Sequence, residues 1–181
     1  MPTIDVEAAA YHQAGHAVAD LHFGFRANPL ALAADAFHCL GHAQRLDGKD
    51  YRDANGQVDP QQVGNAVIVW LAGSAAEREY SQAATVHPAD WAKATDVLAS
   101  LGPHQSFPGW QHQAREFVKQ NWKAIQMVAT DLLENNALDG TELEMIVSIA
   151  NQEKDARANL IRYRELTGKK QTRQFCSPAE I

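Results

Sequence analysis

Two histidines in the segment AYHQAGHAVAD, residues 10–20, stand four residues apart. On an α-helix, side chains at this spacing lie roughly 6 Å apart on one face, so His12 and His16 can bind one metal ion together. Two partly buried histidines that bond to backbone or water are the plain alternative. Gly15 favours a metal site, because glycine is costly inside a helix unless another element approaches closely. A zinc site of this kind needs a third protein ligand from elsewhere in the chain.

A second histidine pair with the same spacing, His38 and His42, serves as a comparison. It lies in FHCLGHAQRL, residues 37–46, which has no helical period and is predicted to be extended. Residues four apart on a strand are separated by about 13 Å and cannot bind one ion together. We therefore expect His38 and His42 to be surface or strand residues.

The elements that must position the first pair are predicted to be mainly helices. Asp5 is expected to cap a helix that runs through both histidines and ends near Gly24. A small β-hairpin or edge strand is expected between about residues 29 and 46. Four further helices are expected. The first starts at Pro60 after the cap Asp59, and the second runs from HPAD (87–90) to Gly102. The third is a long helix over 110–133 interrupted only by Asn121, and the fourth starts at a Thr141–Glu144 capping box and ends at Gly168.

Length and composition are those of an ordinary globular protein. The chain has 181 residues and a net charge of -6, which predicts one domain over 1–181 and no general attraction to nucleic acid or anionic membranes. Cys39 and Cys176 lack a C-x-x-C partner, and no secretion signal or membrane-spanning run is evident, so a cytoplasmic location is expected. Within the domain we distinguish three parts: zinc-site helices and β region (1–103), a long helical hairpin (104–168) and a polar tail (169–181).

Three segments resemble the peptidase domain of FtsH-type ATP-dependent zinc metalloproteases. AYHQAGHAV is similar to that family's YHEAGHA signature, LAGSAAERE (71–79) to its LGGRAAEEL segment and ADWAKAT (89–95) to its NDLERAT segment. A looser similarity continues through residues 121–143, so the resemblance covers nearly the whole chain. It implies a mainly α, helical zincin-like metallopeptidase domain with a small β-hairpin or sheet near the zinc helix.

The resemblance also implies roles for particular residues. It makes Asp90 the third zinc ligand beside His12 and His16, and it gives Glu77 the role of supporting a ligand histidine. Asp90 follows Pro88 in the first turn of a helix, where the helix dipole favours a carboxylate, although an acid that serves only the helix terminus is the alternative. An edge strand beside the zinc helix is expected to hold a peptide substrate by main-chain pairing, with a purely structural hairpin as the alternative. The residues assigned to it are Phe37, His38, Cys39, Leu40, Gly41 and His42.

Two departures from the family pattern decide the expected activity. No G-x-x-x-x-G-K-[ST] motif occurs, so the sequence shows no ATP site. Gln13 stands where zincins carry the glutamate that acts as general base, and an amide cannot accept a proton at neutral pH. The sequence therefore indicates a zinc metallopeptidase impaired at Gln13, acting on unfolded polypeptide or peptide. A catalytically inactive pseudo-peptidase that binds zinc and a peptide or protein partner is the alternative, and a helical domain without metal is a third; homo-oligomer formation is left open.

Overall fold

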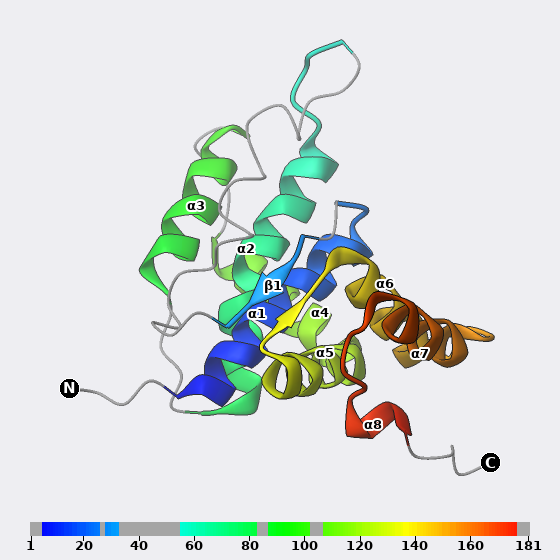
Figure 1. The fold of residues 1–181 in the computed structure, drawn as a ribbon. Coiled ribbons are helices and arrows are strands. Elements are labelled where there is room, and N and C mark those ends of the chain that lie inside the picture. The colour runs from blue at the N-terminus through cyan, green and yellow to red at the C-terminus, as the bar shows by residue number, and fades with distance from the viewer. Residues whose placement is uncertain (1–4, 26–27, 33–54, 83–86, 102–106, 177–181) are drawn as a thin grey trace.

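The protein is described by a computed structural model that covers residues 5–25, 28–32, 55–82, 87–101 and 107–176 (Figure 1). These residues are mainly helical, with one small two-stranded antiparallel sheet, which confirms the predicted class at this level. None of the described helices is both long and apolar enough to cross a lipid bilayer. The elements are α1 (Val6–His22), β1 (Leu30–Ala31), α2 (Pro60–Tyr80), α3 (Pro88–Ala99), α4 (Phe107–Gln120), α5 (Trp122–Asn135), β2 (Ala137–Leu138), α6 (Gly140–Ala150), α7 (Ala156–Thr167) and α8 (Arg173–Cys176).

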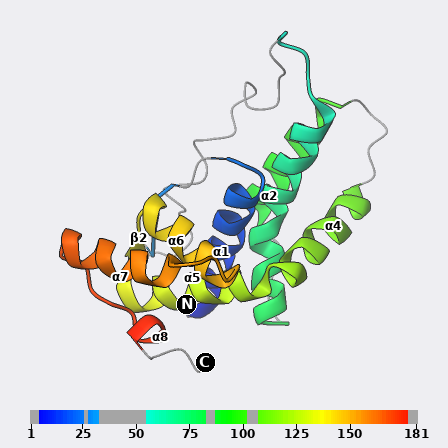
Figure 2. The ribbon, with the colours of Figure 1, turned by 90° about the vertical axis from the view of Figure 1, so that its right-hand side faces the viewer.

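Helix α1 lies at the centre of the fold, packed against α2 on one side and α5 on the other (Figures 1 and 2). It begins at the predicted cap, because the Asp5 carboxylate accepts hydrogen bonds from the N–H groups of Glu7 and Ala8. Helix α2 also begins as predicted, with Asp59 as its cap and Pro60 in its first turn. Helices α3 and α4 pack on α2 and close a second apolar core with it. The element that carries both histidines is therefore enclosed by packed helices.

The predicted long helix over 110–133 is two helices, α4 and α5, which meet at an angle (Figure 2). The break is at Asn121, whose φ of -106° and ψ of 16° depart from helical values. Its side-chain amide donates to the carbonyl of Phe117 over 2.9 Å, and its own backbone N–H donates to the same carbonyl over 3.0 Å. An asparagine side chain that competes for backbone partners in this way disfavours a continuous helix.

The helix expected to run to Gly168 is also divided, into α6 and α7. Gln152 and Asp155, in the intervening turn, have φ values of 61° and 62°, which reverse the chain. The predicted Thr141–Glu144 capping box at the start of α6 is wrong by two residues. The box is formed by Asp139 and Glu142, with backbone-to-carboxylate distances of 2.9 and 3.0 Å. Both D-x-x-E and T-x-x-E fit the rule at this point. The tertiary contacts of Asp139 and Glu142, described below, favour the earlier frame.

The small sheet joins segments that are far apart in the chain. Strand β1 pairs with β2 in antiparallel register, with Leu30 opposite Leu138 and Ala31 opposite Ala137. The prediction of β structure after residue 29 holds for β1, but its partner follows α5. Asn136, with a φ of 62°, ends α5 and turns the chain into β2. The extended segment predicted over 37–46, within that hairpin or edge strand, lies outside the described residues.

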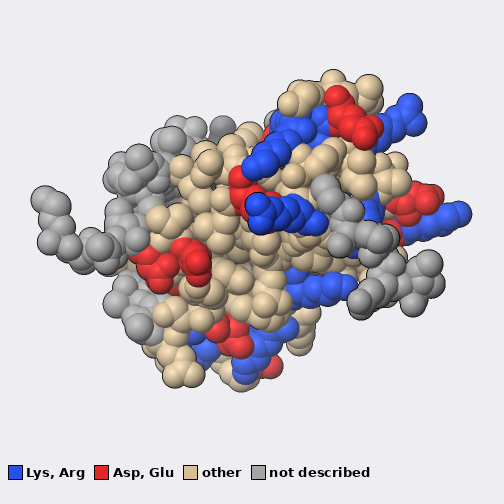
Figure 3. Space-filling model, turned by 60° about the horizontal axis from the view of Figure 1, so that its bottom comes forward, with Lys and Arg blue, Asp and Glu red and all other residues tan. Residues whose placement is uncertain are grey.

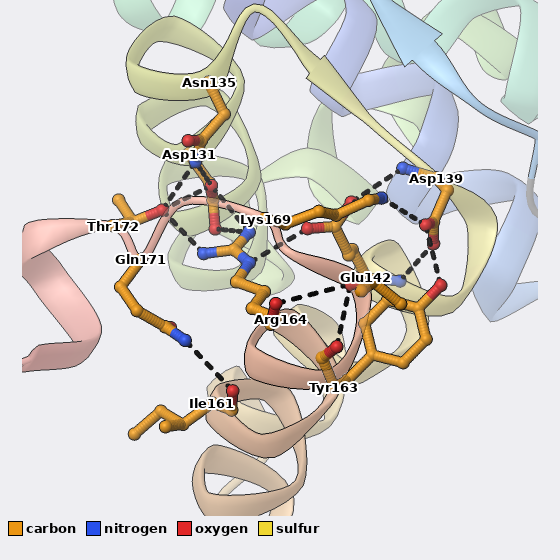
Figure 4. A network of polar contacts seen from close by, with 11 residues as sticks. Asp131, Asn135, Asp139, Glu142, Ile161, Tyr163, Arg164, Lys169, Gln171 and Thr172 are labelled. Carbon is orange, nitrogen blue, oxygen red and sulfur yellow. Dashed lines mark hydrogen bonds and ion pairs between the residues drawn. The ribbon is translucent and has the colours of Figure 1, made fainter.

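A buried ion network joins the C-terminal helices (Figure 4). The guanidinium of Arg164 in α7 donates to both carboxylate oxygens of Asp131 in α5, over 2.9 and 2.8 Å, and to Glu142 in α6 over 2.9 Å. It also donates to the hydroxyl of Thr172 over 2.7 Å, in the segment that leads to α8. All four side chains are at most 2% exposed. Part of the predicted polar tail is therefore tied to the core, and Phe175 in α8 is buried as well.

Charged side chains on the face in Figure 3 are mixed in sign. Lysine and arginine alternate there with aspartate and glutamate among uncharged residues, over the part drawn in colour. The net charge of -6 is thus not gathered into one extended acidic area on that face.

Candidate metal centre

The centre lies where α1, α2 and the first turn of α3 meet. His12 and His16 are 4% and 1% exposed, and Asp90, the third predicted ligand, is 9% exposed. Gly15 allows α1 to approach α2, since a Cβ at this position would lie 2.6 Å from the carbonyl oxygen of Ala72. The close approach predicted from Gly15 is thereby confirmed.

A glycine that the sequence analysis did not single out makes room for the second imidazole. A Cβ at Gly73 in α2 would lie 2.3 Å from Nε2 of His16 and 2.6 and 2.7 Å from two of its ring carbons. Real Cβ contacts essentially never fall below 3.0 Å. The only signal for Gly73 in the sequence is a glycine within a predicted buried helix, which did not by itself indicate what it faces.

Hydrogen bonds at Nδ1 fix the orientation of both imidazoles. Nδ1 of His16 lies 2.8 Å from the backbone carbonyl of Val69. Because a carbonyl only accepts, this nitrogen carries the hydrogen and the neutral ring has its lone pair on Nε2. Nδ1 of His12 lies 3.1 Å from Oε2 of Glu77, which sets the same tautomer there. A supporting role for Glu77 is what the resemblance implied, and this contact is the geometry for it.

Three lone-pair atoms converge as a result. Nε2 of His12 lies 3.1 Å from Nε2 of His16, and Oδ2 of Asp90 lies 3.0 Å and 3.4 Å from these two nitrogens, respectively. Among the described residues, this buried carboxylate oxygen has no partner with good hydrogen-bond geometry. Three acceptors packed this closely repel one another unless a positive charge, a proton or a metal ion, lies among them. These groups could hold a metal ion.

The size of this triangle matches a tetrahedral metal site. Ligand atoms about 2.0–2.1 Å from a zinc ion in tetrahedral geometry are roughly 3.3 Å from each other. The three separations between these ligand atoms run from 3.0 to 3.4 Å. The residues present therefore fit a metal with two imidazole ligands and one carboxylate ligand.

The charge state of Asp90 agrees with a site for a cation. Burial opposes ionisation of this carboxyl group. When a proton and not a metal ion lies among the three atoms, the charge of His16 and hydrogen bonds from both histidines outweigh burial and hold the pKa of Asp90 well below its usual range. Asp90 is thus an ionised ligand at neutral pH, as metal binding requires.

Glu77 and His87 form a second group of contacts next to the first. The same Oε2 of Glu77 that contacts His12 also lies 2.8 Å from Nε2 of His87. Burial raises the pKa of Glu77, but its hydrogen bonds with the two histidines prevail and lower it to about 2. The hydrogen bond to Glu77 raises the pKa of His87 against the effect of its burial. The sequence did not assign a role to His87, which lies three residues before Asp90. No sequence pattern distinguishes a histidine that supports a metal site at such a position from an exposed one.

Two further predicted site elements have a simpler outcome. Gln13 follows His12 on α1 and is 5% exposed, so it is buried. The predicted substrate strand, Phe37 to His42, lies outside the described residues, as does the comparison pair His38 and His42.

Comparison with known proteins does not assign the site. A scan against models of known protein families finds no match for this chain, and a search of curated proteins finds no significantly similar sequence. The function is therefore inferred from the site itself and from the motifs in the sequence.

Proposed function

We propose that the chain is a zinc-binding domain of the FtsH peptidase type, with hydrolysis of peptide bonds impaired at Gln13. The observation that carries the proposal is the triangle of Nε2 of His12, Nε2 of His16 and Oδ2 of Asp90, all with lone pairs directed inward. The motif resemblance supports the same three residues. Two imidazoles and one carboxylate, with no sulfur donor, are the ligand set of many catalytic zinc sites.

Each residue of the centre has a distinct task in this proposal. When bound, a zinc ion with three protein ligands supplies a Lewis acid and lowers the pKa of a water molecule in its open position. His16 is held for binding by the Val69 carbonyl, and His12 is held by Glu77. Gln13 can hydrogen-bond a water molecule or a peptide, but it cannot take up the proton that hydrolysis releases. Loss of a general base lowers the rate about 10² to 10⁴-fold.

The alternative is a pseudo-peptidase that binds zinc and a peptide or protein partner without cleaving it. Gln13 is the observation that favours it, since it removes the base and preserves the ligand set. Under either function the proposed partner is an unfolded polypeptide or peptide in the cytoplasm, and Phe37 to His42 remain the predicted contact strand.

Restoring the base distinguishes the two functions. Gln13→Glu should produce cleavage of an unfolded protein substrate that chelators abolish and added zinc restores. The matched control is Gln13→Glu combined with Asp90→Ala, which should be inactive and hold little zinc. A Gln13→Glu protein that is fully loaded with zinc and inert favours the pseudo-peptidase. A wild-type chain that holds no metal refutes both, whereas His38→Ala with His42→Ala should leave the zinc content unchanged.

A further inference from the structure

His87 connects the start of α3 to α2 through two contacts. It is the residue just before α3, with a φ of -73° and a ψ of 116°, and its side chain makes no capping bond to that helix. Its backbone N–H donates to the hydroxyl of Ser74 over 3.3 Å, and its Nε2 donates to Oε2 of Glu77 over 2.8 Å. Asp90 follows three residues later in the first turn of α3. The position of the Asp90 carboxylate therefore depends on how His87 fixes this end of α3 on α2.

The Glu77 oxygen that accepts from His87 also accepts from Nδ1 of His12. One carboxylate oxygen thus joins a candidate ligand on α1 to the segment that carries another candidate ligand on α3. The rings of His12 and His87 are in direct contact as well, with centroids 4.0 Å apart. Glu77 is half-buried, so bonds from two sides restrict its rotamers in a way that one bond would not.

We propose that His87 is a positioning residue for the metal centre: it holds Glu77 against His12 and sets Asp90 at the imidazole pair. The proposal rests on the metal centre of the proposed function and adds to it a residue that the motif resemblance does not include. His87 does not itself bind the metal bound by His12, His16 and Asp90.

A second metal ion among His12, Glu77 and His87 is the competing explanation, because these groups also lie close enough to hold one. Their chemistry differs from that of the first triangle. Each contact pairs a ring N–H with a carboxylate oxygen, at 3.1 and 2.8 Å, so a proton already satisfies it. A metal here would require His12 to give up its Nδ1 proton while its Nε2 binds the first ion. The geometry therefore favours hydrogen bonding at this group.

The test is the affinity of the full-length chain for zinc, measured by competition with a chromogenic chelator. Loss of a group that orients a metal ligand commonly weakens binding about 10 to 100-fold, and we expect this for His87→Ala. His87→Gln keeps an N–H donor toward Glu77 and should recover most of the affinity. His112→Ala, which removes an exposed histidine from α4, is the matched control and should bind as the wild type does.

A double-mutant cycle separates positioning from a general loss of structure. If His87 acts through Glu77, then His87→Ala should weaken zinc binding far less in a Glu77→Ala background than in the wild type. Cobalt in place of zinc gives a second readout, because the intensity of its visible absorption reports the coordination geometry. That intensity should change in His87→Ala and return in His87→Gln.

The outcomes separate this proposal from the function on which it rests. A wild-type chain without metal overturns both. A zinc-binding wild type with unchanged affinity in His87→Ala, or with fully additive losses in the cycle, overturns only the role of His87. Two zinc ions per chain, falling to one in His87→Ala, would show the competing second site. If circular dichroism shows that His87→Ala does not fold, Ser74→Ala is the deciding variant, because it removes only the hydrogen bond from the backbone N–H of His87. Ser74→Ala should weaken zinc binding measurably but by less than tenfold. Unchanged zinc binding in Ser74→Ala overturns the proposal.

Discussion

Replacing Gly73 with alanine should remove the metal site and leave the fold in place. The new Cβ would lie 2.3 Å from Nε2 of His16, whereas ordinary contact begins at 3.4 Å, so the ring must move by about 1.1 Å. Metal sites tolerate ligand displacements of only about 0.2 Å. We expect zinc affinity to fall by at least about 100-fold, the upper end of the loss seen when only a supporting contact is removed. Overpacking costs about 1–3 kcal/mol, and alanine returns about 0.5–1 kcal/mol in a helix, so the free energy of unfolding of the metal-free protein should fall by roughly 0–2.5 kcal/mol.

The assay combines a zinc competition titration with urea unfolding of the metal-free protein. Gly64→Ala is the matched control, because it adds the same methyl group to the same helix, where a Cβ would lie 2.7 Å from the indole of Trp110. It should cost a similar free energy of unfolding and leave zinc binding unchanged. Zinc affinity in Gly73→Ala equal to that of Gly64→Ala would refute the placement of His16 against α2.

Two further predictions concern the C-terminal helices. Arg164→Met leaves the buried Asp131 without its arginine and leaves Glu142 with Lys169, 2.6 Å away, as its remaining ion-pair partner, so urea unfolding should show a loss of about 3–5 kcal/mol. Arg162→Met, on the exposed side of α7, should cost little, and equal effects of the two substitutions would contradict the buried network. Burial raises the pKa of Asp139, but its contacts with Lys169, Tyr163 and the N–H of Glu142 prevail and lower this pKa in the folded state. The contribution of Asp139 to stability is therefore complete above its unfolded pKa of about 3.9 and is lost as the pH falls through the lower folded pKa. Unfolding measured from pH 6 to pH 2 should therefore depend on pH less steeply in Asp139→Asn than in the wild type, and identical profiles would contradict this.

His12 and His16 of the candidate centre could be predicted from the sequence because their signals are local. Helical periodicity places His12 and His16 on one face, and Gly15 indicates a close helix contact, whichever helix makes it. Asp90 needed the motif resemblance, since its own pattern also suits a helix terminus. Gly73 and His87 could not be assigned, because their roles depend on which residues of other helices they face.

The fold, like the site, could be predicted where it depends on neighbouring residues and could not be predicted where it depends on distant ones. Caps such as Asp5 and Asp59 depend on a few neighbouring residues, and both helices begin where these indicate. The break at Asn121 depends on a choice between side-chain and backbone hydrogen bonds that apolar periodicity does not register. The pairing of β1 with β2 joins segments more than 100 residues apart, and neither two-residue strand has a pattern that identifies its partner.

X-ray absorption at the zinc K-edge of the full-length chain tests the central claim most directly. If the proposed metal centre is correct, the spectrum should show one bound zinc with nitrogen and oxygen ligands at about 2.0–2.1 Å, two of them imidazoles. The bound zinc should be lost in Asp90→Ala. A chain that holds no zinc, or a zinc with sulfur ligands at about 2.3 Å that persists in Asp90→Ala, would contradict it.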